Sequence, residues 1–400
     1  MLKKRLSLLA LLAAFVLVVA ACGDDDAADQ TTTAATAAPA TTAAPATTAA
    51  PATTAATPDT APPVVAGPAA LACMVSDQAG IDDKSFNEVA WRGMLQAEAD
   101  LGVTVEFLES QDATDYRVNI DAFVEQGCDL IVTVGFLLAD DTGAAAADNP
   151  DTNFAIIDFP VFPDAPWLDA DGNMVGNVRG LTYQTDEAGF LAGYLAAGVS
   201  QTGVIGTFGG INIPPVTVFM EGYRNGAAYY DSVKGTETTV LGWDGTDGLF
   251  TDNFTSLDDG RSFGQNLLDE DADVILPVAG PVGLGTGQAI LDFNAAGGSA
   301  MLIGVDADMF FSAPEFSSIL LTSILKNMDA SVFNTINNIV NLGSLGNQYL
   351  GTLANGGIGL APFHDFEAVV GGELAAELAA LQVGISDGSI SVGFPGAEEE

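Results

Sequence analysis

Short apolar runs alternate with amphipathic stretches from about Ala69 onward, and this alternation constrains the fold more than any other feature of the sequence. The run at 71–77 is typical of a strand, and 84–102 follows as a helix with apolar residues at helical spacing and a glycine at its end. The run at 129–135 is apolar throughout, as expected for a parallel strand covered on both faces. The repeated pattern predicts a parallel sheet with right-handed crossovers. Further strands are predicted at 103–110 and 153–158, with helices at 112–127 and 137–148.

A second series of strands and helices begins after Gly176. Two such series in one chain favour two α/β lobes over one large sheet. Ligands of open α/β sheets bind beyond the carboxyl ends of the strands. Four candidate residues fall at those ends, although any acid among them could instead cap the following helix: Asp77, Asp158, Gly280 and Asp306. The strands of this series are predicted at 177–184, 203–208, 237–243, 273–280 and 300–306.

The N-terminus is typical of an export signal rather than of a folded domain. Three basic residues at 3–5 precede an apolar run of 13 residues at 8–20, which is too short to span a bilayer comfortably. Small residues then precede Cys22 in an arrangement that resembles a bacterial lipobox. We expect residues 1–21 to be removed as a lipoprotein signal peptide and Cys22 to carry the lipid that anchors the protein to the extracytoplasmic face of the cell membrane. The alternative is an ordinary signal peptide with a chance cysteine.

Beyond an acidic start, residues 22–68 consist almost wholly of Ala, Thr and Pro. The hexapeptide PATTAA occurs three times in succession, and no large apolar side chain precedes Val64. Nothing in such a segment offsets the entropy of ordering it, and its prolines favour extended conformations. We expect a disordered tether that holds the lobes away from the membrane.

The charge of the chain is strongly one-sided, with 53 acidic residues against 11 basic ones and a formal net charge of −42. Nucleic-acid binding by neutralisation of phosphates needs a basic face, so no nucleic-acid partner is expected. The acidic excess also argues against attraction to anionic lipid. A charge of this size suits saline surroundings, where self-repulsion is damped, although solubility alone would also explain it.

The sequence lacks the usual signatures of catalysis and of metal binding. It has one histidine, His364, and its Gly-rich stretch at 280–287 lacks the lysine of a phosphate-binding loop. The stretch at 169–173 begins like a calcium loop but lacks the later glycine and glutamate. We therefore expect no enzyme activity, no metal and no cofactor.

Cys73 and Cys128 could pair outside the cell. If their strands end level at Asp77 and Gly135, the two cysteines are offset by about three positions, or roughly 10 Å. That separation is too large for a disulfide. The sequence therefore favours two buried free thiols.

Several motifs occur in a recognisable order: GIDDKSFNEVAWRG at 80–93, GCDLIVTVGFLLAD at 127–140, GGINIPPVTVFMEGYRNG at 209–226, GVDAD at 304–308 and LTSILKN at 321–327. Together they resemble the basic membrane protein family of lipoproteins, the purine-nucleoside receptors of ABC importers. The resemblance covers about 70–362. It implies a type I periplasmic-binding-protein fold, which is an α/β fold of two doubly wound parallel-sheet lobes with three hinge crossovers and a ligand cleft.

The resemblance also implies which residues contact the base of the ligand. Phe86 in KSFN and Phe219 in TVFMEG match the aromatic residues that stack on its two faces. Asn87 and Asp158 match positions that hydrogen-bond its edge. A purine is a flat, uncharged ring system that suits two phenylalanine rings, and each stacking contact is worth about 1–3 kcal/mol. Without the flanking motifs, core packing would be the better explanation of either phenylalanine.

Polar groups are expected to hold the sugar of the same ligand. Asp306 in GVDAD and Lys326 in LTSILKN match the residues that bind ribose hydroxyls, and Asp77 and Gly280 are expected as further contacts. A carboxylate accepts hydrogen bonds from vicinal hydroxyls, and an ammonium donates back to them. Lys326 is one of three lysines beyond the signal peptide, and the competing explanation is a structural ion pair with a nearby acid.

These implications lead to one expected function and several alternatives. We expect a monomeric receptor that captures adenosine, guanosine or inosine between its lobes and delivers it to the permease subunits of an ABC importer. Riboflavin, another flat heterocycle with a polyol, fits the same contacts. A surface adhesin or signalling lipoprotein is a further alternative, and the missing phosphate loop disfavours a nucleoside-processing enzyme. The expected lobes are 69–182 plus about 318–345, and 183–317 plus about 346–400.

Overall fold

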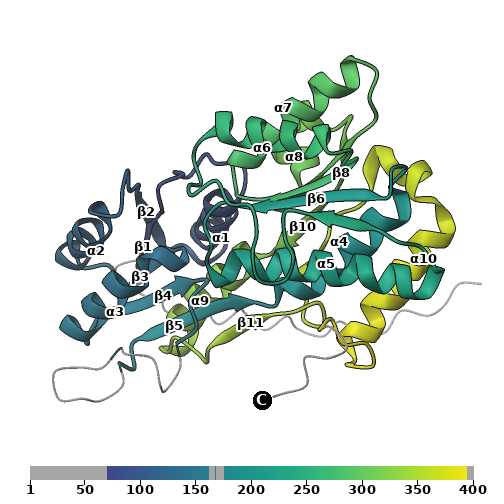
Figure 1. Ribbon diagram of the computed structural model, residues 1–400. Helices are drawn as coiled ribbons and strands as arrows, with labels where there is room; N and C mark the ends of the chain where they lie inside the picture. Colours follow the sequence, from purple (N-terminus) through teal and green to yellow (C-terminus); the bar gives the residue numbers. More distant parts are fainter. Residues whose placement is uncertain (1–69, 162–166, 168–174, 394–400) are drawn as a thin grey trace, which may run out of the picture. The chain divides into compact units, whose positions relative to one another are not determined.

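Two six-stranded sheets organise the part of the chain that the computed structural model describes, which is residues 70–161, 167 and 175–393 (Figure 1). The two sheets confirm the predicted α/β class and the division into two lobes. The predicted signal peptide, the lipid-bearing Cys22 and the tether lie outside the described residues, as does the acidic stretch at 169–173.

The first sheet is parallel throughout. Its strand order is β11 (Tyr349–Gly351), β5 (Val178–Tyr183), β4 (Asn153–Ile157), β3 (Leu130–Val134), β1 (Leu71–Val75) and β2 (Thr104–Leu108). The helices between its strands are α1 (Phe86–Leu101), α2 (Asp115–Gln126) and α3 (Ala139–Asp148). The first of them ends where the sequence predicts, because Gly102 adopts the left-handed conformation (φ 70°) that closes a helix.

The second sheet has the order β12 (Ile358–Leu360), β10 (Leu320–Lys326), β9 (Met301–Asp306), β8 (Val274–Val278), β6 (Val204–Gly209) and β7 (Thr239–Leu241). All its pairs are parallel except that β12 runs antiparallel to β10. Its helices are α4 (Thr185–Val199), α5 (Pro214–Lys234), α6 (Leu257–Asp269), α7 (Val282–Ala295) and the short α8 (Met309–Ser312). The segment His364–Ser386 is long and apolar enough to cross a membrane, but its helix α10 (Glu367–Ser386) packs against α4 of this lobe.

The chain crosses between the two sheets three times, after β5, after β10 and between β11 and β12. These crossings correct two of the predicted lobe boundaries. β10, expected in the first lobe, belongs to the second sheet, and β11, expected in the second lobe, pairs with β5 at the edge of the first. An apolar strand has the same pattern in either sheet, so periodicity does not reveal which edge it joins. The following helix α9 (Met328–Leu342) does lie in the first lobe, against α1.

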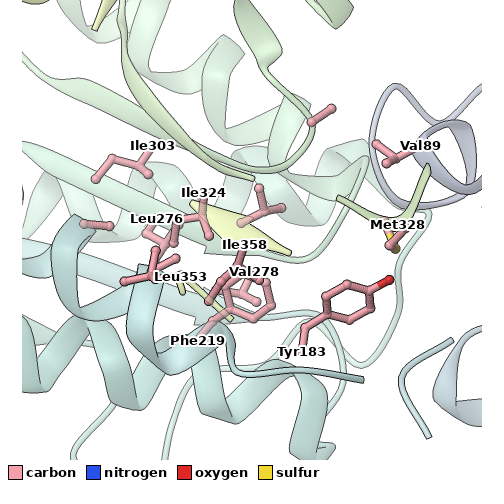
Figure 2. Packing of buried hydrophobic residues seen from close by; sticks show 14 of the residues in the cluster. Val89, Tyr183, Phe219, Leu276, Val278, Ile303, Ile324, Met328, Leu353 and Ile358 are labelled. Atoms are coloured by element: carbon pink, nitrogen blue, oxygen red, sulfur yellow. The ribbon is translucent and has the colours of Figure 1, made fainter. Parts of the chain in front are cut away.

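One buried apolar cluster continues from one lobe into the other. Figure 2 shows part of it, with Val89 of α1 and Met328 toward one side and Leu276 and Ile303 of the second sheet toward the other. The helices α4 and α5 contribute side chains to it, and they pack closely together because glycines on both allow their backbones to approach. At Gly193, a side chain would collide with the backbone of the partner helix.

Cys73 and Cys128 form a disulfide, so the prediction of free thiols is wrong. The register behaves as expected, since Cys73 on β1 lies opposite Ile131 on β3, three residues beyond Cys128. However, Cys128 is not in the strand. It lies in the turn after α2, where Gly127 has a φ of 83° and Cys128 N–H bonds Phe123 O. This turn brings the Cα atoms of the two cysteines to 6.1 Å, which is within reach of a disulfide.

Candidate ligand cleft

A pocket lies at the carboxyl ends of strands from both sheets. It contains about 650 Å³ of empty space, measured out to its opening into solvent. Because parallel strands of one sheet end at the same edge, residues far apart in the sequence meet there. Seven of the eight predicted ligand contacts line the pocket: Asp77, Phe86, Asp158, Phe219, Gly280, Asp306 and Lys326.

Phenylalanines from both lobes contribute to the pocket wall. Phe86 is the first residue of α1, and Phe219 lies in the second turn of α5. The adjacent prolines Pro214 and Pro215 start α5, where a missing N–H leaves no intrahelical bond unmade. Phe219 is almost fully buried within the continuous apolar cluster (Figure 2). Two further aromatic residues, Phe136 and Phe254, line the wall and were not among the predicted contacts.

Lys326 is the one cationic residue of the pocket lining, and only 2% of its side chain is exposed. Its ammonium lies 2.5 Å from Asp158 Oδ2, which belongs to the other lobe. It also lies over two of the pocket's rings, 4.8 Å from the centroid of Phe86 and 5.8 Å from that of Phe219. The carboxylate and the ring faces together offset the hydration that this buried charge loses.

Two of the pocket carboxyls stand on left-handed backbone. Asp158 follows β4 with a φ of 70°, and Asp306 ends β9 with a φ of 66°. Aspartate tolerates this conformation better than most residues because its short side chain can bond locally. Each strand thus ends in an abrupt change of direction with its carboxyl at the pocket wall.

The pocket carboxyls are buried, which raises the pKa of Asp77 and of Asp158 and raises that of Asp306 to about 6. Asp77 accepts a hydrogen bond from Asn87 Nδ2 at 2.7 Å, and Asp306 accepts one from Ser85 Oγ at 2.8 Å. In each of these three carboxyls, a single oxygen accepts all the hydrogen bonds from the described residues. Their other oxygens have no hydrogen-bond partner among the described residues, so the pocket presents acceptors to a ligand: Asp77 Oδ2, Asp158 Oδ1 and Asp306 Oδ1.

Asn87 is the one predicted contact that does not line the pocket. It is fully buried in the first turn of α1, where its side-chain amide donates to Asp77 Oδ1 at 2.7 Å and to Asp83 Oδ2 at 3.1 Å. Its own Oδ1 has no hydrogen-bond partner in the part of the chain that the structure describes. Asn87 follows Phe86 and therefore points to another side of the helix. From there it orients the carboxyl of Asp77 without itself lining the pocket.

Asp83 lines the pocket and was not among the predicted residues. Its carboxyl accepts from the backbone N–H groups of Ser85 (2.9 Å), Asn87 (2.9 Å) and Glu88 (3.1 Å), so it caps α1. Burial raises its pKa to about 6 despite these bonds. An aspartate shortly before a helix start is a capping signal that the sequence does contain.

Tyr183 is a further residue near the pocket that was not among the predicted contacts. It ends β5, at the first crossing between the lobes, and its ring lies 5.1 Å from the ammonium of Lys326. Its hydroxyl is 2.6 Å from Ser331 Oγ, which fixes the ring. The sequence does contain one signal for this residue, since an aromatic side chain at the carboxyl end of a predicted strand is a candidate cleft contact.

The arrangement can hold a polar ligand, and it contains no grouping suited to a metal. No cluster of three or more His, Cys, Asp or Glu side chains that could bind a metal ion occurs within residues 70–161, 167 and 175–393. Four carboxyls and one ammonium line the pocket, and its remaining lining is largely apolar: Asp77, Asp83, Asp158, Asp306 and Lys326.

Comparison of the sequence with protein families matches residues 70–378 to the family described as ABC transporter substrate-binding protein PnrA-like. The chain is 33% identical to Basic membrane protein A of Borreliella burgdorferi over 234 residues. These aligned residues cover 58% of this chain and 62% of that protein. It is 31% identical over 299 residues to an uncharacterised lipoprotein of Pyrococcus furiosus, covering 73% and 70%. It is 32% identical over 244 residues to the ABC transporter nucleoside-binding protein BmpA of Lactococcus lactis, covering 59% and 64%.

Solved structures share the fold. A solute-binding protein of an ABC transporter from Aeropyrum pernix superposes with a TM-score of 0.71 at 25% identity, covering 80% of this chain and 92% of that one. The arabinose-binding protein AraP of Geobacillus stearothermophilus superposes with a TM-score of 0.53 at 13% identity, covering 76% and 99%. These matches confirm the predicted type I periplasmic-binding-protein fold.

Proposed function

The chain belongs to the PnrA-like family of ABC transporter substrate-binding proteins, and on that premise we propose that its cleft captures purine nucleosides for an ABC importer. Members of this family bind a solute rather than transform it, in agreement with the expectation that the chain is not an enzyme. The proposal goes beyond the family in naming the ligand: adenosine, guanosine or inosine.

The observation that carries the proposal is the presence of Phe86 and Phe219, from different lobes, in one pocket. A purine between the two rings would contact both lobes, and each stacking contact is worth about 1–3 kcal/mol. A ligand that contacts both lobes stabilises the closed arrangement over the open one. A nucleoside-binding relative in Lactococcus lactis is consistent with this ligand class.

The free carboxylate oxygens of Asp77, Asp158 and Asp306 support the sugar part of the proposal. An ionised carboxylate only accepts hydrogen bonds, so a matching ligand must bring donors. Ribose brings three hydroxyls, and Lys326 beside them can donate back. Gly280, which lines the same pocket with a φ of 53°, adds a place where backbone can approach the ligand.

The location and partners of the protein are part of the same proposal. Relatives in Pyrococcus furiosus and Pyrococcus abyssi are named lipoproteins, and the N-terminal sequence favours a lipid on Cys22. A lipid-anchored monomer on the extracytoplasmic face would present captured nucleoside to the permease subunits of the importer.

Isothermal titration calorimetry on residues 65–400, which form one compact unit, tests the proposal. The chain is unfolded with its disulfide intact and refolded, to remove any ligand carried over. It is then titrated with adenosine, guanosine, inosine, uridine, riboflavin and ribose. Micromolar or tighter binding of purine nucleosides is expected. Binding of riboflavin alone replaces the ligand class, and absence of heat with every solute overturns the proposal.

Paired variants test the residues. Phe219→Ala and Lys326→Ala are each expected to weaken the best-binding nucleoside about five- to 150-fold, since each removes about 1–3 kcal/mol of contact. The matched controls are Phe311→Ala, whose side chain is 73% exposed outside the pocket, and Lys234→Ala, whose ammonium pairs with Glu377. Equal effects from the pocket and control variants would contradict the assigned contacts.

A further inference from the structure

A second contact joins the lobes outside the pocket. Lys84 Nζ lies 2.8 Å from Glu315 Oε1. Lys84 precedes α1 in the first lobe, and Glu315 lies in the turn Pro314–Phe316 just before β10 of the second. Neither residue lines the pocket, and both side chains are partly exposed, at 38% and 48%.

The three consecutive residues 84–86 reach across the cleft in three different ways. Lys84 makes the outer ion pair, Ser85 Oγ donates to Asp306 Oδ2 at 2.8 Å, and Phe86 lines the pocket. Lys84 has a φ of 60°, a conformation that a residue with a long side chain rarely adopts. The backbone of Lys84 thus adopts an unfavourable conformation at the residue whose side chain contacts the other lobe.

The placement of lysines singles out the same contact. Only three lysines follow the signal peptide, in a chain with a net charge of −42. Two of them pair with an acid of the opposite lobe, Lys326 inside the pocket and Lys84 outside it. The third, Lys234, pairs with Glu377 within the second lobe, between α5 and α10. In so acidic a protein, each cation between the lobes offsets their mutual repulsion.

We propose that the Lys84–Glu315 pair is a latch that keeps the lobes closed over a bound solute and sets the rate at which the solute leaves. This inference rests on the proposed solute capture. The pair exists only when the lobes meet, so it is absent from the open form that a solute enters. Opening must break it. The latch therefore slows dissociation, and it slows association only to the extent that the solute-free protein is already closed.

Stopped-flow displacement tests the latch, with 2-aminopurine riboside as a fluorescent probe and adenosine as the competitor. Lys84→Gln and Glu315→Gln are each expected to raise the dissociation rate by up to about fivefold, the effect of an exposed ion pair worth up to about 1 kcal/mol. Association rates rise by no more than the gain in the open population that the spin labels below report. The charge swap Lys84→Glu with Glu315→Lys is expected to return the dissociation rate toward the wild-type value.

The Lys234–Glu377 pair provides the matched control, since it is an ion pair within one lobe. Lys234→Gln is expected to leave both rates unchanged. Wild-type dissociation rates in Lys84→Gln and Glu315→Gln overturn the latch, and so does a charge swap that dissociates as fast as the single variants.

A measurement without solute separates failure of the latch from failure of the proposed function. Spin labels on Glu98→Cys in α1 and Gln265→Cys in α6, both exposed, report the distance between the lobes. The latch variants are expected to shift the distance distribution toward open forms, and the charge swap to shift it back. If no nucleoside binds, the spin-label distances still test the latch. Distance distributions that do not change in the latch variants overturn the latch.

Discussion

Asp306 combines burial with a hydrogen bond from Ser85, and burial raises its pKa to about 6. In the proposed complex its ionised carboxylate accepts from a sugar hydroxyl. Protonation removes that acceptor, so affinity for adenosine is expected to be constant above pH 7 and to fall as the pH drops through 6. At pH 5 it should be about tenfold weaker, one pH unit below the pKa. Calorimetry across this range measures the effect.

Asp306→Asn is the control for this pH dependence. Asparagine still offers an oxygen to Ser85 but cannot ionise, so the variant should bind weakly with little change between pH 5 and 7. Asp83 also has a pKa raised to about 6, but its oxygens accept from backbone N–H groups of α1. An affinity that stays constant down to pH 5 in the wild type would refute the role assigned to Asp306.

The balance of charge in the cleft also predicts which ligands are rejected. Lys326, the cation of the lining, already pairs with Asp158, and three other carboxyls share the pocket. A phosphate would meet these acids with no free cation in the lining to receive it. Adenosine 5′-monophosphate is therefore expected to bind at least a hundredfold more weakly than adenosine. Side-by-side titration at pH 7.5 checks this, and equal affinities would show that the sugar end faces solvent.

Side chains at the site were predictable to different degrees. Asp77 follows β1 and Asp306 ends β9, and the carboxyl ends of parallel strands define the cleft whatever the other details of the fold. Asn87 lies outside the pocket lining, in the first turn of α1 that Asp83 caps, and the sequence does not reveal how that turn is rotated. Tyr183 was missed because its ring meets Lys326 only through the crossing of the chain between lobes.

At the scale of elements, the disulfide ties β1 to the turn that enters β3. It closes a loop with a sequence separation of 55, so its loss should lower the free energy of unfolding by about 2–4 kcal/mol. Urea unfolding of residues 65–400 with and without dithiothreitol measures this. Cys128→Ser should match the reduced wild type. Two reactive thiols in the unfolded, unreduced chain would contradict the disulfide.

Elements that carry their own start and stop signals were predictable, and those defined by distant partners were not. Helix α1 ends at Leu101 because Gly102 closes it, which local sequence reveals. Strand β10 is assigned to a lobe by its pairing with β9, and β11 by its pairing with β5. The disulfide was missed for a related reason, since the turn at Gly127 alters a distance that strand geometry alone overestimates.

For the whole molecule, the net charge of −42 predicts a marked dependence of stability on salt. Repulsion among acids disfavours the compact state, and salt screens it. The Tm is expected to rise by several degrees between 0.02 and 0.2 M NaCl, a range in which screening changes most. Differential scanning fluorimetry measures this at pH 7.5. A Tm that falls or stays constant would mean that ion pairs such as Lys326–Asp158 outweigh the repulsion.

The three crossings between the lobes also constrain how the protein can be made. β5 remains an open edge until β11 pairs with it, and Tyr349 follows Tyr183 by 166 positions. β10 likewise remains at the edge of the second sheet until β12 pairs with it. Until residues 349–360 have been made, the longer strands β5 and β10 are therefore the sheet edges, which are sites for wrong pairing. A chain that stops short of Tyr349 has the six-residue β5 and the seven-residue β10 as sheet edges, in place of the three-residue strands β11 and β12. Short edge strands are poorer templates for wrong pairing, so the final segment shields the longer strands.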